Sequence, residues 1–314
     1  MKFLAIDKIL FFTPYSIGFA LSLAVMFIFS MFHSKKRGFD RENTKTVFLV
    51  FVMLQLVFGR LIYVFFNRSQ ILFDSVDGFF IGLGPIFETW KGGFSSFGVV
   101  LGFMVSVLLA SKLKKFSFSK ALGVFSCPFM LFYALLRLIQ PLGNQGYGAW
   151  LENGFFPLAI KNNFDEWYVA IFFFEFVIFI LAFLYMLFNK KAFNRGYFAM
   201  FVIACLQIFF ESLHGDAQLR FEINHFIRAE MLLYLILIVV LLIFKHIKIK
   251  KTKALIIDII MLLLFAAFVI MAEFHEKIHL SDTLLYSLSF IGAVSSSLVF
   301  SLFPNELNSI EDSN

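Results

Sequence analysis

An arginine where a long apolar segment ends offers the clearest chemistry in this sequence. Arg137 lies in the stretch YALLRLIQPLGNQGYG, residues 133–148, and is followed by glycines and by the amide side chains of Gln140, Asn144 and Gln145. A charged side chain is costly to bury in a membrane, so it is more often functional than incidental. Its planar set of donors suits a phosphate held at two points. The stretch therefore indicates a phosphate site, and the alternative is an arginine that reaches out to lipid headgroups.

A carboxylate and an imidazole offer a second possibility further along the chain. Gln207, Glu211 and His214 recur at helical spacing, which places them on one face at the outer end of a predicted helix near 197–213. Ionisable side chains that face the interior of a membrane bundle indicate a functional site, and a histidine there can act as a general base. The alternative is a pair that caps the helix end, where a protonated histidine suits the helix dipole.

Two further polar elements come earlier in the chain. Gly92 and Gly93 let the backbone approach a ligand closely, and successive amides there suit an anion, although a plain turn into the next span is equally compatible. Arg60 lies inside an apolar run. We expect Arg60 to pair with a carboxylate or a carbonyl of the bundle, in a structural role.

The composition specifies a membrane protein to hold these residues. Of 314 residues, 60% are hydrophobic and 15% are charged, whereas soluble domains have roughly a quarter charged residues. The net charge is +6, but the basic residues lie in short loops, and the absence of a long soluble segment argues against a nucleic-acid partner. Cys127 and Cys205 lie in apolar segments, so neither a metal site nor a disulfide is indicated, and we expect no cofactor.

Nine apolar segments are long enough to cross a membrane, for which about 20 residues are needed. They cover residues 10–32, 46–66, 97–113, 121–139, 167–188, 197–213, 227–247, 254–274 and 282–303. The fold class predicted from them is an all-α polytopic integral membrane protein.

The distribution of basic residues predicts how these spans are oriented. Lysines and arginines gather in alternate loops, at 33–45, 112–120, 189–196 and 245–253. Such loops are typically cytoplasmic, so we expect the N-terminus outside and Arg137 at the outer leaflet. The other loops, at 67–96, 140–166 and 214–226, then face outward.

Together, these polar elements resemble the prolipoprotein diacylglyceryl transferase family, from about residue 10 to 245. The resemblance rests on six motifs in order: Gly59-Arg60-x-x-Tyr63, Trp90 to Ser95, Arg137 to Gly148, Phe155-Phe156-Pro157, Tyr168 at the start of the fifth predicted span, and Glu211 to Asp216. It implies a seven-span core over 1–250, to which this chain adds a transmembrane hairpin over 251–303 and an acidic cytoplasmic tail over 304–314. It also implies a bacterial inner membrane.

The family resemblance implies a reaction and its partners. The diacylglyceryl group of phosphatidylglycerol passes to the lipobox cysteine of an exported preprolipoprotein, and glycerol phosphate is released. The residues expected to take part share an outward-facing position: His214 and Glu211 as catalytic groups, Arg137, Gln140, Gln145, Gly148 and Gln207 around the lipid phosphate, and Gly92 and Gly93 in a loop beside them.

Departures from the family pattern leave other functions open. Phe97 stands where the family has a histidine, Ala20 where it has a tyrosine, and Gln207 where it has a second arginine, while Gln140 and Gln145 replace an asparagine and a glutamate. Losing a positioned base typically costs about 10²- to 10⁴-fold in rate. A relative that binds phospholipid or signal peptide without turnover is therefore the alternative. A transporter is disfavoured, because the sequence has no internal repeat.

Overall fold

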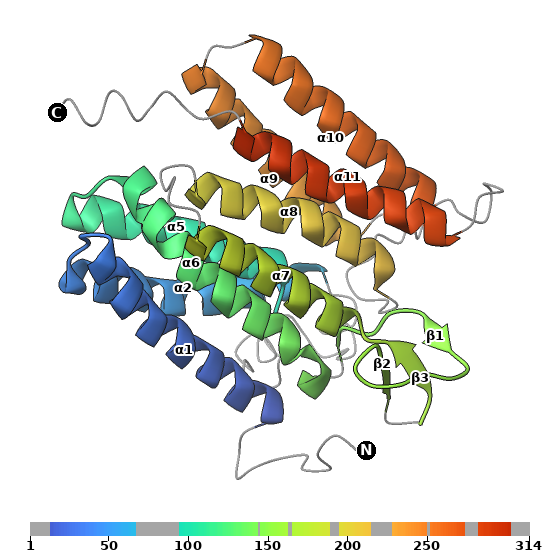
Figure 1. The fold of residues 1–314 in the computed structure, drawn as a ribbon. Helices are drawn as coiled ribbons and strands as arrows, with labels where there is room; N and C mark the ends of the chain where they lie inside the picture. The colour runs from blue at the N-terminus through green and yellow to red at the C-terminus, as the bar shows by residue number, and fades with distance from the viewer. Residues whose placement is uncertain are drawn as a thin grey trace, which may run out of the picture. The chain divides into compact units, whose positions relative to one another are not determined.

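The computed structural model describes residues 13–66, 94–143, 145–162, 165–188, 195–214, 228–249, 252–273 and 282–302. These residues are almost entirely helical, apart from one small sheet (Figure 1). The chain divides into two compact units: Met1–Phe188 with His214–Leu219, and Asn189–Leu213 with Arg220–Asn314. The boundaries expected at 250 and 303 stay predictions, and the acidic tail lies outside the described residues.

A helix occupies the position of every predicted span. The helices are α1 (Pro14–Lys36), α2 (Arg41–Phe66), α5 (Ser96–Lys114), α6 (Phe118–Leu138), α7 (Ile171–Phe188), α8 (Arg195–Leu213), α9 (Ala229–Ile249), α10 (Thr252–Glu273) and α11 (Asp282–Leu302). Among the described residues, α1, α2, α5, α6, α7 and α8 are long and apolar enough to cross a membrane, and α10 and α11 contain shorter apolar stretches. The prediction of an all-α multi-pass membrane protein is confirmed.

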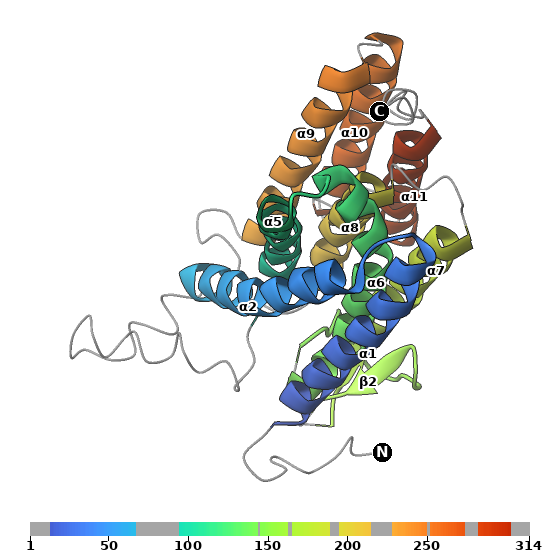
Figure 2. The same ribbon diagram turned by 90° about the vertical axis from the view of Figure 1, so that its left-hand side faces the viewer.

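Capping and close packing define the helices of the first unit. Thr13 caps α1, where its hydroxyl accepts a hydrogen bond from the Ser16 amide and Pro14 occupies the first helical position. α2 packs closely along α5, because a Cβ atom on Gly98 would lie 2.5 Å from the Phe58 carbonyl oxygen. Small residues commonly allow such close approach between membrane helices. α1 in turn packs along α6 (Figure 2).

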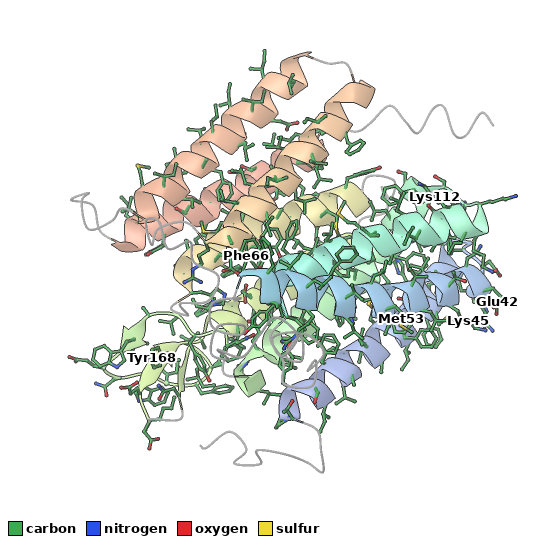
Figure 3. All side chains as sticks on the ribbon, turned by 180° about the vertical axis from the view of Figure 1, so that it is seen from behind. Glu42, Lys45, Met53, Phe66, Lys112 and Tyr168 are labelled. Atoms are coloured by element: carbon green, nitrogen blue, oxygen red, sulfur yellow. The ribbon has the colours of Figure 1, made fainter. Side chains whose placement is uncertain are left out.

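Charged residues gather at one end of the first unit. α1 ends in Lys35 and Lys36, and Lys112 lies in the last turn of α5. Figure 3 shows Glu42, Lys45 and Lys112 at this end and Tyr168 at the opposite end. The basic loops at 33–45 and 112–120 thus lie together, as the sequence indicated. Which side of the membrane they face stays a prediction.

A small sheet precedes α7 and corrects the start of the fifth span. Strands β1 (Trp150–Leu151), β2 (Ala159–Lys161) and β3 (Trp167–Val169) form an antiparallel sheet in the order β1-β3-β2. The span predicted from residue 167 begins at Ile171 instead. Residues 167–169 are apolar enough to extend the span, but aromatic and β-branched side chains favour a strand, and β3 has a pairing partner on each side.

A buried ion pair joins three helices of the second unit. In α9, Lys245 Nζ donates hydrogen bonds to Asp258 Oδ2 of α10 at 2.7 Å and to the Phe300 carbonyl oxygen of α11 at 3.2 Å. The side chains of Lys245 and Asp258 are 4% and 3% exposed. A charge inside a membrane segment is costly unless it is paired. This contact therefore ties the hairpin of α10 and α11 to α9.

Removing one partner of this pair should destabilise the second unit by about 3–5 kcal/mol, because the other charge stays buried without compensation. Asp258→Leu and Lys245→Met should each lower the midpoint of thermal unfolding in detergent, and the double variant should recover much of the loss. The exposed pair of Lys161 and Asp165, 3.8 Å apart, supplies the control, since Lys161→Met should change little. A double variant no more stable than Asp258→Leu would contradict the assignment.

Candidate active site

Arg137 lies in the last turn of α6, where its positive charge suits the negative end of the helix dipole. α6 stops at Leu138, and the short 3₁₀ helix η3 (Gln140–Gly143) follows directly. Arg137 is only 3% exposed. Its environment is therefore made by protein groups, and these groups decide what the guanidinium can do.

Three polar side chains lie against the Arg137 guanidinium, and a fourth lies against the carboxylate of Glu175. Arg137 Nη2 donates a hydrogen bond to Tyr133 Oη at 2.6 Å, and Arg137 Nε lies 3.7 Å from Glu175 Oε1. With the Gln140 amide turned so that its nitrogen faces Glu175, Nε2 donates to Glu175 Oε2 at 3.2 Å and Oε1 accepts from Arg137 Nη1 at 2.6 Å. His214 Nε2 lies 3.7 Å from Glu175 Oε2. We call Tyr133, Arg137, Gln140, Glu175 and His214 the Arg137 cluster.

Glu175 is the centre of this cluster and was not predicted from the sequence. It lies in the second turn of α7 and is 0% exposed, with both oxygens directed at cluster partners. A signal was present in the sequence, because one carboxylate interrupts the apolar run IFFFEFVIFI at residues 171–180. Ionisable groups in such positions are rare and pair within the bundle. The same reasoning would have found Asp258.

The three residues predicted to lie on one helical face have different surroundings in the structure. α8 ends at Leu213, so His214 lies just beyond the helix, and it belongs to the first unit with Glu175. Gln207 and Glu211 belong to the second unit, where Gln207 is fully buried and Glu211 Oε2 lies 3.4 Å from Arg228 Nη1. The structure thus places His214 beside Glu175, and its expected catalytic role stays a prediction. The roles expected for Gln207 and Glu211 stay predictions.

Two glycines bring Gln140 to the start of α7. Gly146 has a φ of +83°, and a Cβ atom there would lie 2.9 Å from Gln140 Oε1 and 2.9 Å from Phe172 Cβ. A Cβ atom on Gly148 would lie 2.7 Å from Ile171 Cγ1, and the Gly148 amide donates to the Val169 carbonyl at 2.8 Å. Glycine is needed at both positions. Gly148 therefore has a packing role, and its expected contact with lipid stays a prediction.

The remaining predicted loop residues lie near the cluster or outside the described chain. The backbone amide of Gln145 donates to the backbone carbonyl of Gln140 at 3.2 Å, and the Gln145 side chain is half-buried. Its contact with lipid stays a prediction. Gly92 and Gly93 lie outside the described residues. Within the described part of the chain, no group of three histidine, cysteine, aspartate or glutamate side chains is placed to hold a metal ion.

The arrangement can support acid–base chemistry next to a phosphate. A carboxylate beside an imidazole orients the ring and stabilises its protonated form, as in other base–carboxylate pairs. A distance of 3.7 Å is loose for a hydrogen bond, but such contacts commonly tighten when substrate binds. The guanidinium on the other oxygen of Glu175 places a positive charge within the same buried cluster.

Comparison with known proteins assigns the chain to a family. Residues 4–247 match the family model described as prolipoprotein diacylglyceryl transferase. The chain belongs to this family. A protein of Listeria innocua named phosphatidylglycerol–prolipoprotein diacylglyceryl transferase is 23% identical over 249 residues, which cover 74% of this chain and 86% of the relative. Proteins with the same name from Ehrlichia ruminantium and Fusobacterium nucleatum are 22% and 27% identical, over 72% and 49% of this chain and 88% and 51% of their own.

At two positions where the sequence departs from the family pattern, the structure shows a buried apolar side chain, Phe97, and an exposed one, Ala20. Phe97, in the first turn of α5, is 9% exposed, so an apolar ring is buried where the family pattern has a histidine. Ala20 faces outward from α1, whereas Tyr15 on the same helix is buried against Gly143. Tyr15 is thus the tyrosine that α1 buries. The family spacing counted from Pro14 leads to Ala20 and does not identify it.

Arg60, the other buried arginine of the family-like motifs, has an aromatic contact. Its guanidinium carbon lies 5.4 Å from the centre of the Tyr63 ring, one turn further along α2. A cation over an aromatic face is stabilised by the quadrupole of the ring. This contact suits the structural role expected for Arg60, and the expected pairing with a carboxylate or a carbonyl stays a prediction.

Proposed function

We propose that this protein transfers the diacylglyceryl group of phosphatidylglycerol to the cysteine thiol of an exported preprolipoprotein and releases glycerol phosphate. The Arg137 cluster carries the proposal: in a chain of this family, it holds an arginine suited to phosphate and a histidine oriented by a carboxylate, both buried in a membrane bundle. Arg137 suits the role of the group that receives the leaving phosphate, and His214 suits the role of the base for the thiol, which supports the proposal.

The cluster suggests how the reaction proceeds. When the contact between His214 Nε2 and Glu175 tightens into a hydrogen bond, Nε2 carries the proton and Nδ1 keeps the lone pair. Nδ1 takes the thiol proton as the sulfur attacks the glycerol carbon that carries the phosphate ester. The carbon–oxygen bond breaks, and its electron pair leaves with glycerol phosphate. Arg137 stabilises the charge on the departing phosphate, since donors fixed in advance act most strongly in a buried site.

The proposed reaction requires the Arg137 end of the first unit to face outward, because the acceptor is an exported polypeptide. The basic residues at the opposite end support this orientation through the usual excess of positive charge in cytoplasmic loops. In intact cells, Glu166→Cys, at an exposed position, should react with a membrane-impermeant thiol reagent and Lys114→Cys should not. The native Cys127 and Cys205 are buried and add no background. Labelling of Lys114→Cys from outside would contradict this orientation.

A second function has specific support. A buried Phe97 ring stands where the family pattern has a histidine. This feature suits a relative that binds phosphatidylglycerol or a signal peptide without turnover. This protein would compete for lipid or lipoprotein but would modify neither.

Complementation separates the two functions. In a bacterial strain depleted of its own transferase, the intact chain should restore growth and the lipid modification of lipoproteins, and Glu175→Leu should not. The exposed Lys161→Met supplies a control that should restore both. An intact chain that accumulates in the membrane and restores neither would overturn the proposed transfer.

A further inference from the structure

Strand β1 and the loop that connects it to β2 expose a group of large apolar side chains. Trp150 is 57% exposed, Phe155 65%, Phe156 58% and Leu158 41%. We call residues 150–158 the aromatic loop. Exposed apolar side chains that are neighbours in the chain generally mark a contact surface rather than a surface that faces water.

The register of the sheet places one part of this loop level with the start of α7. The Ala170 amide, directly before α7, donates to the Leu158 carbonyl at 2.9 Å, and Ala159 pairs with Val169. Phe155 and Phe156 therefore lie at the end of the sheet that adjoins a membrane-spanning helix. Side chains of α7 such as Phe174 and Leu181 are themselves exposed, as expected for a surface that faces lipid. The apolar part of the loop therefore lies level with the beginning of this lipid-facing surface.

The opposite end of the sheet is polar. β2 runs away from α7 to Asn162, and β3 returns from Glu166 toward α7. Asn162, Asp165 and Glu166 are joined by backbone hydrogen bonds and by the side-chain contact of Asn162 with Glu166. A strand advances about 3.3 Å per residue, so this end lies roughly 10 Å further from α7 than Ala159 does. The sheet thus has an apolar end at the membrane boundary and a charged end directed away from it.

We propose that the aromatic loop inserts into the boundary layer of the bilayer, on the face where α6 ends and α7 begins. Phe155, Phe156 and Leu158 reach the edge of the hydrocarbon, and the Trp150 ring lies among the headgroups, as aromatic residues do in other membrane proteins. The occupant of this apolar surface is the lipid of the membrane that the helices already span. The proposal rests on the membrane-spanning fold and is independent of the transfer reaction.

The insertion also fixes the depth of the Arg137 cluster. The Phe172 amide donates to the Gly146 carbonyl at 3.2 Å, and the Gly146 backbone lies against the Gln140 side chain. The loop that carries Gln140 therefore joins the sheet to the first turn of α7. A sheet held at the headgroup layer holds this turn, and with it Glu175, at a constant height relative to lipid phosphates.

Tryptophan fluorescence in vesicles of phosphatidylcholine and phosphatidylglycerol tests the insertion. Trp90, Trp150 and Trp167 are replaced by phenylalanine in the full chain, and one reporter is then introduced, Phe156→Trp in the aromatic loop or Glu166→Trp at the charged end. We expect lipid brominated near the headgroup end of its acyl chains to cause a loss of emission from Phe156→Trp and none from Glu166→Trp. Aqueous iodide on both sides of the membrane should give the reverse pattern.

Two outcomes would overturn the proposal. In one, iodide quenches both reporters equally and brominated lipid quenches neither, so the loop faces water. In the other, Phe156→Trp is shielded only after a lipobox peptide is added, so the surface binds polypeptide instead of lipid. Both replaced side chains are exposed. The helical content of each variant by circular dichroism should therefore match that of the parent.

Discussion

His214→Ala should lower diacylglyceryl transfer about 100-fold or more, because a positioned general base contributes roughly 10²- to 10⁴-fold. His214 is the histidine within reach of Glu175, and an alanine there leaves the thiol without a proton acceptor. Transfer by the parent should also fall on acidification, since a protonated imidazole cannot accept the thiol proton. The measurement is the initial rate at which label passes from phosphatidylglycerol to a lipobox peptide.

A second buried histidine of the same unit provides the control for this result. His33 lies near the end of α1, among the basic residues and stacked on Phe29. His33→Ala should retain the rate of the parent. If His214→Ala transfers the diacylglyceryl group as fast as the parent does, another group is the base, although the family function would stand.

Arg137→Lys should weaken the binding of phosphatidylglycerol roughly 10- to 100-fold, which corresponds to a charge-assisted hydrogen bond of about 1.5–3 kcal/mol. The positive charge is kept, but a lysine lacks the planar pair of donors that holds a phosphate at two points. It also cannot contact Tyr133, Gln140 and Glu175 together, as the guanidinium does. Equilibrium binding of labelled phosphatidylglycerol to the protein in detergent measures the effect.

Arg60→Lys is the matched control for lipid binding. Arg60 is also buried, but its guanidinium contacts the Tyr63 ring of its own helix. We expect this variant to lower the yield of folded protein while the folded fraction binds lipid as the parent does. Equal lipid affinity of Arg137→Lys, Arg137→Ala and the parent would show that Arg137 does not hold the phosphate.

The sequence was sufficient for the membrane fold because long apolar segments and alternating basic loops depend on local composition alone. It was insufficient where two structures suit the same residues. Residues 167–169 extend the apolar run of the fifth span, yet their backbone groups pair with β1 and β2. A composition window cannot separate a strand at the membrane edge from the first turn of a helix.

The candidate site was predicted in part, for a related reason. Arg137 was found because a charge at the end of an apolar helix is unusual in itself, and His214 was found by its spacing from Glu211. Its partner turned out to be Glu175 of another helix, because α8 ends one residue before His214. Which residues of separate helices meet depends on how each helix is rotated in the bundle, and helical spacing within one segment does not contain that information.

The proposed transfer is tested most directly by following both products of the reaction with purified protein in vesicles. Phosphatidylglycerol labelled in its acyl chains and a lipobox peptide are supplied together. We expect label to become attached to the peptide through a thioether, with an equal amount of glycerol phosphate released, and Glu175→Leu to abolish both. Retained binding of phosphatidylglycerol without label on the peptide or release of glycerol phosphate would contradict it and leave a lipid-binding relative.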